Sequence, residues 1–320
     1  MSYKTLRLIY PFAAAIFSGT LLTFAFPKYD LGWIGWFAIV PLLISILGRN
    51  AWLVFFTSLI FGVTFFTGVF SWIFDVPGYK IHHHFLLGLY FGPLMGLFGL
   101  TVNRIARRWN TGAALLATPF VWVSFEFIRS NLSFLALPWA LLGHSQFQYP
   151  LLIQIASYTG AYGISFLIAF ANAALAAVVL SFFASFEGDR LYKVSPASRK
   201  TAISMLLATV AFAGLTLLYG NVILSQPING QGIKTSVLQG NIDQKMKGNP
   251  KKHSRFIMQK YTDLTRQALK DQPELIVWPE AATPGFVLKN TSLYQQTTSL
   301  VKEAKTYFLI GSSEYPNLVI

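Results

Sequence analysis

The 320-residue sequence contains no cysteine, which excludes disulfide bonds, thiolate metal sites and a cysteine nucleophile within these residues. Charged residues are also scarce, at 12% of the chain, whereas a soluble domain usually carries about 25%. Acidic residues are the rarer sign, with 12 Asp and Glu against 25 Lys and Arg. Hydrophobic residues, by contrast, make up 54% of the chain. This balance excludes an ordinary soluble enzyme and indicates a membrane protein.

The net charge of +13 could indicate a nucleic-acid partner, but the position of the basic residues argues otherwise. They fall mostly in short loops between apolar runs, which is a signal of membrane topology and not a phosphate-binding stripe. We therefore expect no nucleic-acid partner.

Seven apolar stretches are long enough to cross a bilayer, which takes roughly 20 helical residues each. They lie near residues 7–26, 31–48, 51–74, 84–105, 112–130, 161–185 and 202–225. The first stretch lacks a small-residue cleavage site, so it is not interpreted as a signal peptide. We predict that residues 1–225 form a multi-pass α-helical membrane bundle of about seven spans.

Lys and Arg concentrate in alternate loops of this predicted bundle. The loops with the most basic residues are the N-terminal segment and those after the second, fourth and sixth spans, with Lys4, Arg7, Arg49, Arg104, Arg107, Arg108, Arg190, Lys193, Arg199 and Lys200. The positive-inside rule then puts the N-terminus in the cytoplasm of a bacterial inner membrane. Seven crossings place the chain after about residue 225 in the periplasm.

The composition changes after residue 226, and the remaining pattern is typical of an α/β domain. Residues 225–230 are rich in turn formers and read as a linker. Strand-like runs near 233–240, 275–278 and 307–311 alternate with helical periodicity over 253–270 and 291–305. Residues 226–320 are thus predicted to form a second domain of the α/β class, incomplete and with a thin core.

The sharpest chemical feature is a carboxylate at the end of the second predicted strand. The apolar run 275–278 leads directly into Pro279, which cannot continue a central strand, so Glu280 should lie at the strand's carboxyl end. Open α/β sheets bind ligands at that edge. We expect Trp278 to give Glu280 apolar surroundings that suit a general base. A solvated glutamate or a helix-capping partner would fit the same residues.

Several strings resemble known families. Val277-Trp278-Pro279-Glu280 resembles the first catalytic motif of the nitrilase superfamily. Other strings are similar to one branch of it, the apolipoprotein N-acyltransferases: Phe24-Ala25-Phe26-Pro27-Lys28-Tyr29-Asp30, Glu126-Phe127-Ile128-Arg129 followed by Leu137-Pro138-Trp139, and Gln239-Gly240-Asn241-Ile242. The strings occur in the family's order from about residue 10 to residue 315.

The resemblance implies that residues 226–320 begin a nitrilase-like α-β-β-α sandwich, with Glu280 as the general base of a Glu-Lys-Cys triad. It implies transfer of an acyl chain from a membrane phospholipid to the α-amine of a diacylglyceryl-cysteine apolipoprotein, through a thioester, with no metal or organic cofactor. The family's cysteine is absent here. Lys289, Lys302 and Lys305 lie too close to Glu280 to match its lysine. We therefore expect a C-terminally truncated chain that is inactive by itself.

Four other features have alternative interpretations. Glu126 and Arg129 are either a structural pair or part of a head-group site. Trp139 is either a membrane-belt aromatic or, by the resemblance, part of a substrate pocket. His82-His83-His84 could bind a metal, but we expect an interfacial loop. Residues 246–250 are predicted to be a flexible loop, which in the family is a mobile arm over the site.

The alternative from another functional class is a membrane transporter with a small periplasmic cap. A transporter needs ionisable groups or broken helices near the bilayer midplane. The predicted spans carry few charges away from their ends, and Gly160-Ala161-Tyr162-Gly163, which could break a helix, lies near an end. A nitrilase acting on a small amide would leave seven spans unexplained.

Overall fold

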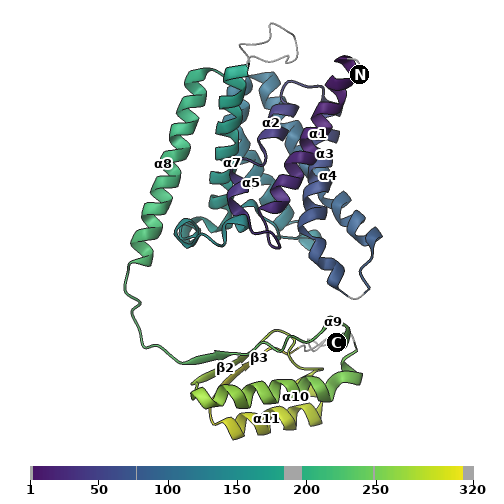
Figure 1. Cartoon of the computed structure of the whole chain (residues 1–320), viewed down its shortest axis with the longest axis vertical. Helices are drawn as coiled ribbons and strands as arrows, with labels where there is room; N and C mark the ends of the chain where they lie inside the picture. The colour runs from purple at the N-terminus through teal and green to yellow at the C-terminus, as the bar shows by residue number, and fades with distance from the viewer. Residues whose placement is uncertain (1–2, 77, 184–196, 248, 313–320) are drawn as a thin grey trace. The chain divides into compact units, whose positions relative to one another are not determined.

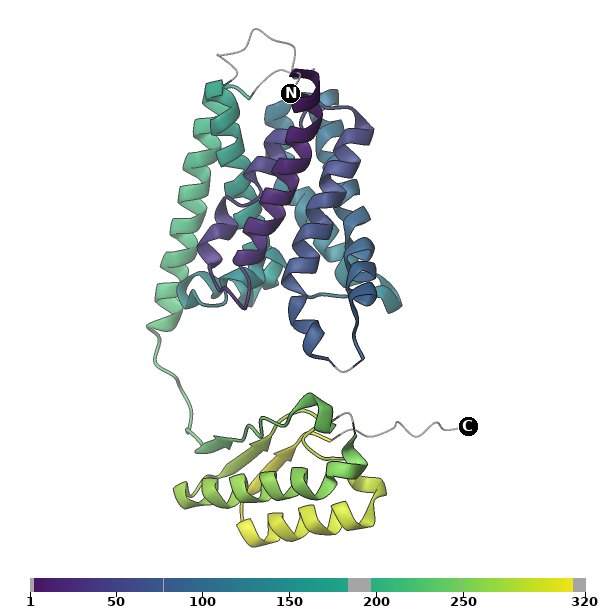
Figure 2. The ribbon, with the colours of Figure 1, turned by 45° about the vertical axis from the view of Figure 1, so that its right-hand side comes forward.

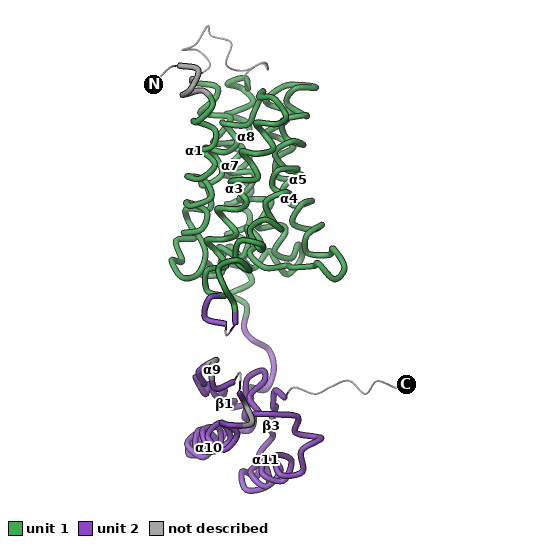
Figure 3. Tube along the Cα trace, turned by 90° about the vertical axis from the view of Figure 1, so that its right-hand side faces the viewer, with its two compact units in different colours: residues 1–73, 79–226 green, residues 74–78, 227–320 purple. Residues whose placement is uncertain are grey.

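The computed structural model describes residues 3–76, 78–183, 197–247 and 249–312. The chain divides into two compact units (Figure 3). Unit one comprises Met1–Ile73 and Tyr79–Gln226, and unit two comprises Phe74–Gly78 and Pro227–Ile320. Each unit has its own hydrophobic core.

Unit one is a bundle of helices that lie side by side (Figures 1 and 2). Its helices are α1 (Tyr3–Phe24), α2 (Val40–Ile46), α3 (Ala51–Val69), α4 (Ile81–Arg108), α5 (Thr111–Ser130), α6 (Pro150–Ile153), α7 (Ala156–Phe183) and α8 (Arg199–Leu224). Among the described residues, five helices are long and apolar enough to cross a membrane, namely α3, α4, α5, α7 and α8. Two shorter apolar helical segments cover Leu8–Phe24 and Gly32–Ile46. The prediction of an apolar helical bundle is confirmed.

The second predicted apolar stretch, near residues 31–48, is broken into two short helical segments. A 3-10 helix, η1 (Gly32–Trp36), precedes the short α2. Pro41, near the start of α2, has no N–H and cannot continue a helix from the preceding turn. The buried side chain of Asn172, on α7, binds main-chain groups on both sides of the break. Its Nδ2 donates to the Gly35 carbonyl and its Oδ1 accepts from the Ile39 N–H, both at 2.8 Å.

Local capping residues explain where three of the long helices begin. The side chains of Asn50, Asn110 and Ser198 accept hydrogen bonds from main-chain N–H groups three residues later, at the starts of α3, α5 and α8. Helix α7 is interrupted at Gly160, whose φ of 60° and ψ of −170° are not helical. The string Gly160-Ala161-Tyr162-Gly163, which the sequence marked as able to break a helix, does so at its first glycine.

Unit two contains a three-stranded parallel sheet with the order β1-β2-β3. The strands are β1 (Thr235–Val237), β2 (Leu275–Trp278) and β3 (Tyr307–Ile310). Helices α10 (Pro250–Ala268) and α11 (Thr291–Ala304) lie against one face of the sheet (Figure 1). Short helices complete the unit: α9 (Gln244–Lys247), η5 (Leu269–Asp271) and η6 (Val287–Lys289). The predicted alternation of strands and helices is confirmed.

The two faces of the sheet differ in burial. On the helix side, Ile276 and Trp278 are buried, and Trp278 stacks on Tyr261 of α10 at 5.0 Å between ring centroids. On the other side, Val237 and Leu309 are 73% and 62% exposed. Parallel sheets are normally covered on both faces, so this apolar face is unusual for a parallel sheet.

Candidate functional site

Glu280 follows the central strand, as the sequence predicted. Strand β2 ends at Trp278, and Pro279 leads the chain out of the sheet before Glu280. The end of β3 approaches this turn closely, because a Cβ atom on Gly311 would lie 2.2 Å from the Pro279 carbonyl oxygen. The Ala282 N–H also donates to the Gly311 carbonyl at 3.0 Å. The carboxyl ends of the two strands therefore hold the segment that carries Glu280.

The prediction that Glu280 lies in apolar surroundings was wrong. Trp278 turns toward the helices, where its indole N–H donates to the Thr265 hydroxyl at 3.2 Å. Glu280 is exposed. Alternation along the strand puts Trp278 in the core, and the proline then releases the next residue to the surface. An exposed carboxylate at a sheet edge can accept a proton from an incoming group.

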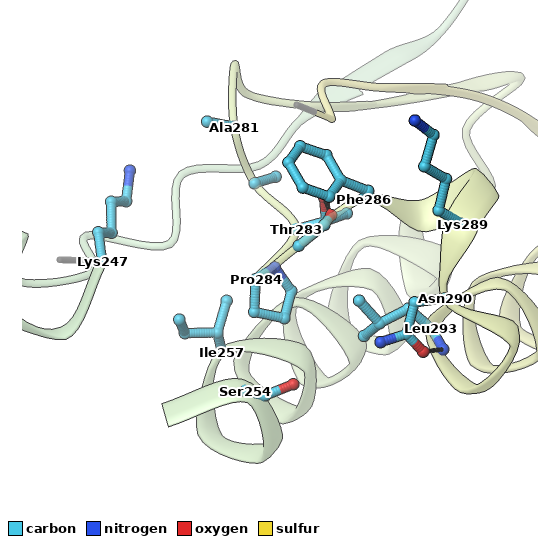
Figure 4. A pocket seen from close by; sticks show the side chains of 12 residues that line it. Lys247, Ser254, Ile257, Ala281, Thr283, Pro284, Phe286, Lys289, Asn290 and Leu293 are labelled. Atoms are coloured by element: carbon cyan, nitrogen blue, oxygen red, sulfur yellow. Dashed lines mark hydrogen bonds between the residues drawn. The ribbon is translucent and has the colours of Figure 1, made fainter. Parts of the chain in front are cut away.

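A cavity of about 700 Å³ lies at this edge of unit two. It is lined by residues of α9, α10, the turn after Glu280 and the start of α11, namely Lys247, Ser254, Ile257, Ala281, Ala282, Thr283, Pro284, Gly285, Phe286, Lys289, Asn290 and Leu293. Figure 4 shows Lys247 and Lys289 on opposite sides of the turn with Thr283, Pro284 and Phe286. No sequence pattern joins these two lysines, which lie on separate elements far apart in the chain.

Residues 246–250 were predicted to be a flexible loop, and this prediction was partly wrong. Met246 and Lys247 belong to the helical turn α9, and α10 begins at Pro250. Proline is favoured at the first position of a helix, because an N–H group there would have no partner within the helix. Gly248 lies outside the described residues.

In unit one, Glu126 and Arg129 are almost completely buried near the end of α5, with 2% and 1% exposure. Arg129 donates to the carbonyl oxygens of Leu137, Trp139 and Ala140, at 2.9, 2.6 and 2.9 Å. These hydrogen bonds show that the side chain binds the loop after α5.

Glu126 binds the other end of the same loop. Its Oε1 accepts from the Leu142 N–H at 2.6 Å and from the Trp122 indole N–H at 3.0 Å. Of the two interpretations, the contacts favour a structural function, in which each side chain satisfies main-chain groups of the loop.

Trp139 lies at a second cavity, of about 350 Å³, in unit one. The lining is mostly aromatic: Phe26, Pro27, Val69, Phe70, Trp72, Trp139, Ala140, His144 and Phe147. The Trp139 ring lies 5.5 Å from that of Trp72 and is about half exposed. Partial burial and the nearby charge of Arg129 lower the pKa of His144 in the cavity wall.

The three consecutive histidines do not form the loop that we expected. They occupy the first turn of α4, where the Lys80 N–H donates to His83 Nδ1 at 3.1 Å. His84 is buried and contacts the Thr67 carbonyl through Nε2 at 2.8 Å. The Nε2 atoms of His82 and His83 are 3.1 Å apart. Within the described ranges, no three His, Asp or Glu side chains form a group that could hold a metal ion.

Comparisons with known proteins give a consistent result. A family model described as the apolipoprotein N-acyltransferase N-terminal domain matches residues 18–174. An apolipoprotein N-acyltransferase from Geobacter metallireducens is 31% identical over 308 residues, which cover 94% of this chain and 57% of that protein. The enzyme of that name from Vibrio parahaemolyticus is 28% identical, with 95% and 57% covered. The Haemophilus influenzae protein of that name is 22% identical, with 98% and 58% covered. The chain thus spans little more than half the length of these relatives.

Proposed function

Because this chain belongs to the apolipoprotein N-acyltransferase family, we propose that it forms the membrane bundle and the first part of the catalytic domain of such an enzyme. The whole enzyme would transfer an acyl chain from a membrane phospholipid to the N-terminal α-amine of a diacylglyceryl-cysteine apolipoprotein. The observation that carries this proposal is Glu280, held at the carboxyl edge of a parallel sheet next to a cavity-lining turn, in a chain whose other unit is built of apolar helices.

Unit two would be the start of a nitrilase-like α-β-β-α sandwich. Helices α10 and α11 already cover one face of its sheet, so a second sheet would pack on the opposite face. Val237, Val277 and Leu309 share that face, because they are paired in register across the three strands. Val237 and Leu309 are exposed and Val277 is half-buried, and such an apolar face is what one sheet presents to another in a sandwich.

The proposed chemistry has two steps. Glu280 accepts the proton of a cysteine thiol supplied by a part of the enzyme outside these 320 residues, and the thiolate attacks the acyl ester of a phospholipid. The ester C–O bond breaks, and the lysophospholipid alkoxide leaves with the proton from Glu280. The apolipoprotein amine then attacks the thioester, Glu280 accepts a proton from that amine, and the C–S bond breaks to release the thiolate. A lysine, also outside these residues, would stabilise the oxyanion.

Unit one would admit the lipid substrates. We propose that Trp139 contacts a substrate at the aromatic cavity, and that Glu126 and Arg129 support that contact by holding the loop of Trp139. Aromatic side chains offer an apolar surface that suits acyl chains, while the polar groups of the loop are already paired with protein. This arrangement would explain why a soluble type of catalytic domain is joined to a membrane bundle.

The proposed topology has seven crossings, with a cytoplasmic N-terminus and unit two in the periplasm. In Figures 1 and 2, the beginning of α1, the end of α7 and the start of α8 lie at one end of the bundle. Arg199 and Lys200 begin α8 at that end, which fits a cytoplasmic side. The broken segment of η1 and α2 would be one of the seven crossings, because irregular backbone is tolerated at membrane depth where protein buries it.

A transporter with a periplasmic cap is the less favoured alternative. Transporters use buried ionisable groups to bind their substrates or coupling ions. Glu126 and Arg129 are buried, but their hydrogen bonds bind the main chain of the loop from Leu137 to Leu142. The buried charges of α5 are thus engaged in structure.

The decisive experiment replaces Glu280 by Gln in the full-length enzyme and measures transfer of a radiolabelled acyl chain from phospholipid to a lipoprotein peptide. Loss of a general base should slow transfer by about 10²–10⁴-fold while the melting temperature in detergent stays unchanged. Glu274→Gln, at the opposite end of β2, is the matched control and should transfer normally. Normal transfer by a folded Glu280→Gln enzyme would overturn the proposal.

The 320-residue chain provides a second test of the mechanism. Because these residues contain no cysteine, the chain should form no hydroxylamine-sensitive acyl adduct when it is incubated with labelled phospholipid. A labelled adduct above background would identify another nucleophile and contradict the thiol mechanism.

A further inference from the structure

The residue that follows Glu280 has a strained backbone. Ala281 has a φ of 50°, in the left-handed region that residues with a side chain rarely adopt. Such a conformation persists only where the surrounding structure imposes it, and it is common where a protein directs a functional side chain. Ala281 is exposed, so packing of its own side chain does not hold it there. The contacts that impose the conformation therefore come from the chain on either side of it.

Gly311, the residue after β3, lies against the main chain on both sides of Glu280. A Cβ atom on Gly311 would lie 2.2 Å from the Pro279 carbonyl oxygen and 2.7 Å from the Glu280 Cα. Main-chain atoms cannot rotate away as a flexible side chain can, so only glycine fits this position without moving the turn. The Gly311 carbonyl also accepts from the Ala282 N–H at 3.0 Å. The chain that enters Glu280 and the chain that leaves it thus both contact Gly311.

Thr283 makes a second connection between this turn and the end of β3. Its side chain is buried, with 7% exposure. The hydroxyl donates to the Gly285 carbonyl at 2.9 Å and lies 3.0 Å from the hydroxyl of Ser312. Two consecutive residues after β3 therefore contact two consecutive residues of the turn, Ala282 and Thr283. The end of a neighbouring strand thus sets the path of the chain past Glu280.

We propose that Gly311 and Thr283 are positioning residues, which set the direction in which the Glu280 carboxylate points. The inference rests on the proposed role of Glu280 as the general base. Because Glu280 is exposed, the path of its main chain, and not packing around its carboxylate, determines where the carboxylate lies. A general base has to be within hydrogen-bond reach of the proton that it accepts. A displacement of about 1 Å in a reacting group lowers the rate by about 10²-fold.

The test measures kcat and KM for acyl transfer from phospholipid by variants of the full-length enzyme. Gly311→Ala has to move the turn by about 1 Å to relieve the contact, so kcat should fall about 10²-fold while KM stays unchanged. Gly232→Ala is the matched control and should have normal kcat, because a Cβ atom there would have no neighbour within 4 Å. Thr283→Val keeps the shape without the hydroxyl and should lower kcat about tenfold. Thr283→Ser restores the hydroxyl and should restore kcat.

Positioning is separated from a general loss of structure by repeating Gly311→Ala in the Glu280→Gln enzyme. A residue that acts through the Glu280 carboxylate should cause no further loss of the residual transfer once that carboxylate is gone. An equal loss in both backgrounds would mean that Gly311 only supports the fold and would overturn the inference. If Gly311→Ala lowers the melting temperature in detergent to the point of unfolding, Thr283→Val provides the same comparison.

The outcome for the positioning residues is distinct from that for the proposed function. Normal kcat in folded Gly311→Ala and Thr283→Val enzymes, together with an inactive Glu280→Gln enzyme, would reject the positioning role and leave the general base in place. Normal transfer by Glu280→Gln would instead reject the general base itself.

Discussion

The guanidinium group of Arg129, on α5, donates a 2.6 Å hydrogen bond to the main-chain oxygen of Trp139, ten residues further along the chain. From the same helix, Glu126 accepts from the Leu142 N–H at 2.6 Å. Two charged residues, three positions apart and thus on one face of a helix, hold both ends of the loop that forms a wall of the aromatic cavity. The shape of that cavity therefore depends on buried polar contacts.

Arg129→Lys should loosen this loop although it keeps the charge. A single ammonium group cannot reproduce the fork that reaches three carbonyl oxygens, so at least one of them loses its charged donor. We expect a loss of roughly 2–4 kcal/mol in the free energy of unfolding, measured by denaturant titration in mixed micelles. Arg107→Lys, at the exposed end of α4, should change nothing. Equal stability of the two variants would contradict this assignment.

Substitutions at two glycines of helix α8 test how closely α6 packs on α8. A Cβ atom on Gly220 would lie 1.9 Å from the Leu151 carbonyl oxygen of α6, whereas a Cβ on Gly214 would have no neighbour within 4 Å. Gly220→Ala should therefore cost about 1–3 kcal/mol by overpacking. Gly214→Ala should be neutral or stabilise the helix by up to about 1 kcal/mol. Melting temperatures in detergent compare the two, and a neutral Gly220→Ala would contradict close packing of α6 on α8.

Tyr261 should make unit two sensitive to alkaline pH. Burial of its phenol against Trp278 raises the pKa of Tyr261. Its contribution to stability is fully present below about pH 10, the ordinary tyrosine value, and is lost as the pH rises through the folded-state value, because the unfolded chain ionises first. Tyr261→Phe should unfold at higher pH than the unmodified chain in a fluorescence-detected titration.

The exposed Tyr294 is the control for that titration. Tyr294→Phe removes a phenol from the same unit and should leave the alkaline midpoint unchanged. A shift of equal size in both variants would mean that tyrosine content in general, and not the buried ring, sets the midpoint.

The topology predicts activity of reporter fusions. Alkaline phosphatase fused after Gln231 should be active, because it folds only on the periplasmic side, and a fluorescent protein fused there should be dark. Fusions after Asn110, between α4 and α5, should give the opposite pattern, since Arg107 and Arg108 mark that loop as cytoplasmic. An inactive phosphatase fusion together with a fluorescent fusion at Gln231 would place unit two on the cytoplasmic side and contradict the proposed topology.

The sequence by itself determined the features that depend on neighbours along the chain. Apolar runs predicted the long helices, the alternation of strands and helices predicted an α/β domain, and Pro279 predicted that Glu280 follows the end of β2. Each is a local effect, because helix formation, strand formation and the loss of a proline N–H act over a few residues.

Tertiary structure decided what depends on residues far apart in the sequence. Asn172 binds Ile39 from 133 positions away and holds the break in the second apolar segment, where hydropathy showed only an apolar stretch. The Trp278 ring entered the core against Tyr261 and left Glu280 exposed. Lys247 and Lys289 line one cavity only because the fold brings α9 and η6 to the same edge of the sheet. Such contacts form when whole elements pack, and short-range sequence patterns contain no information about which distant side chains packing will bring together.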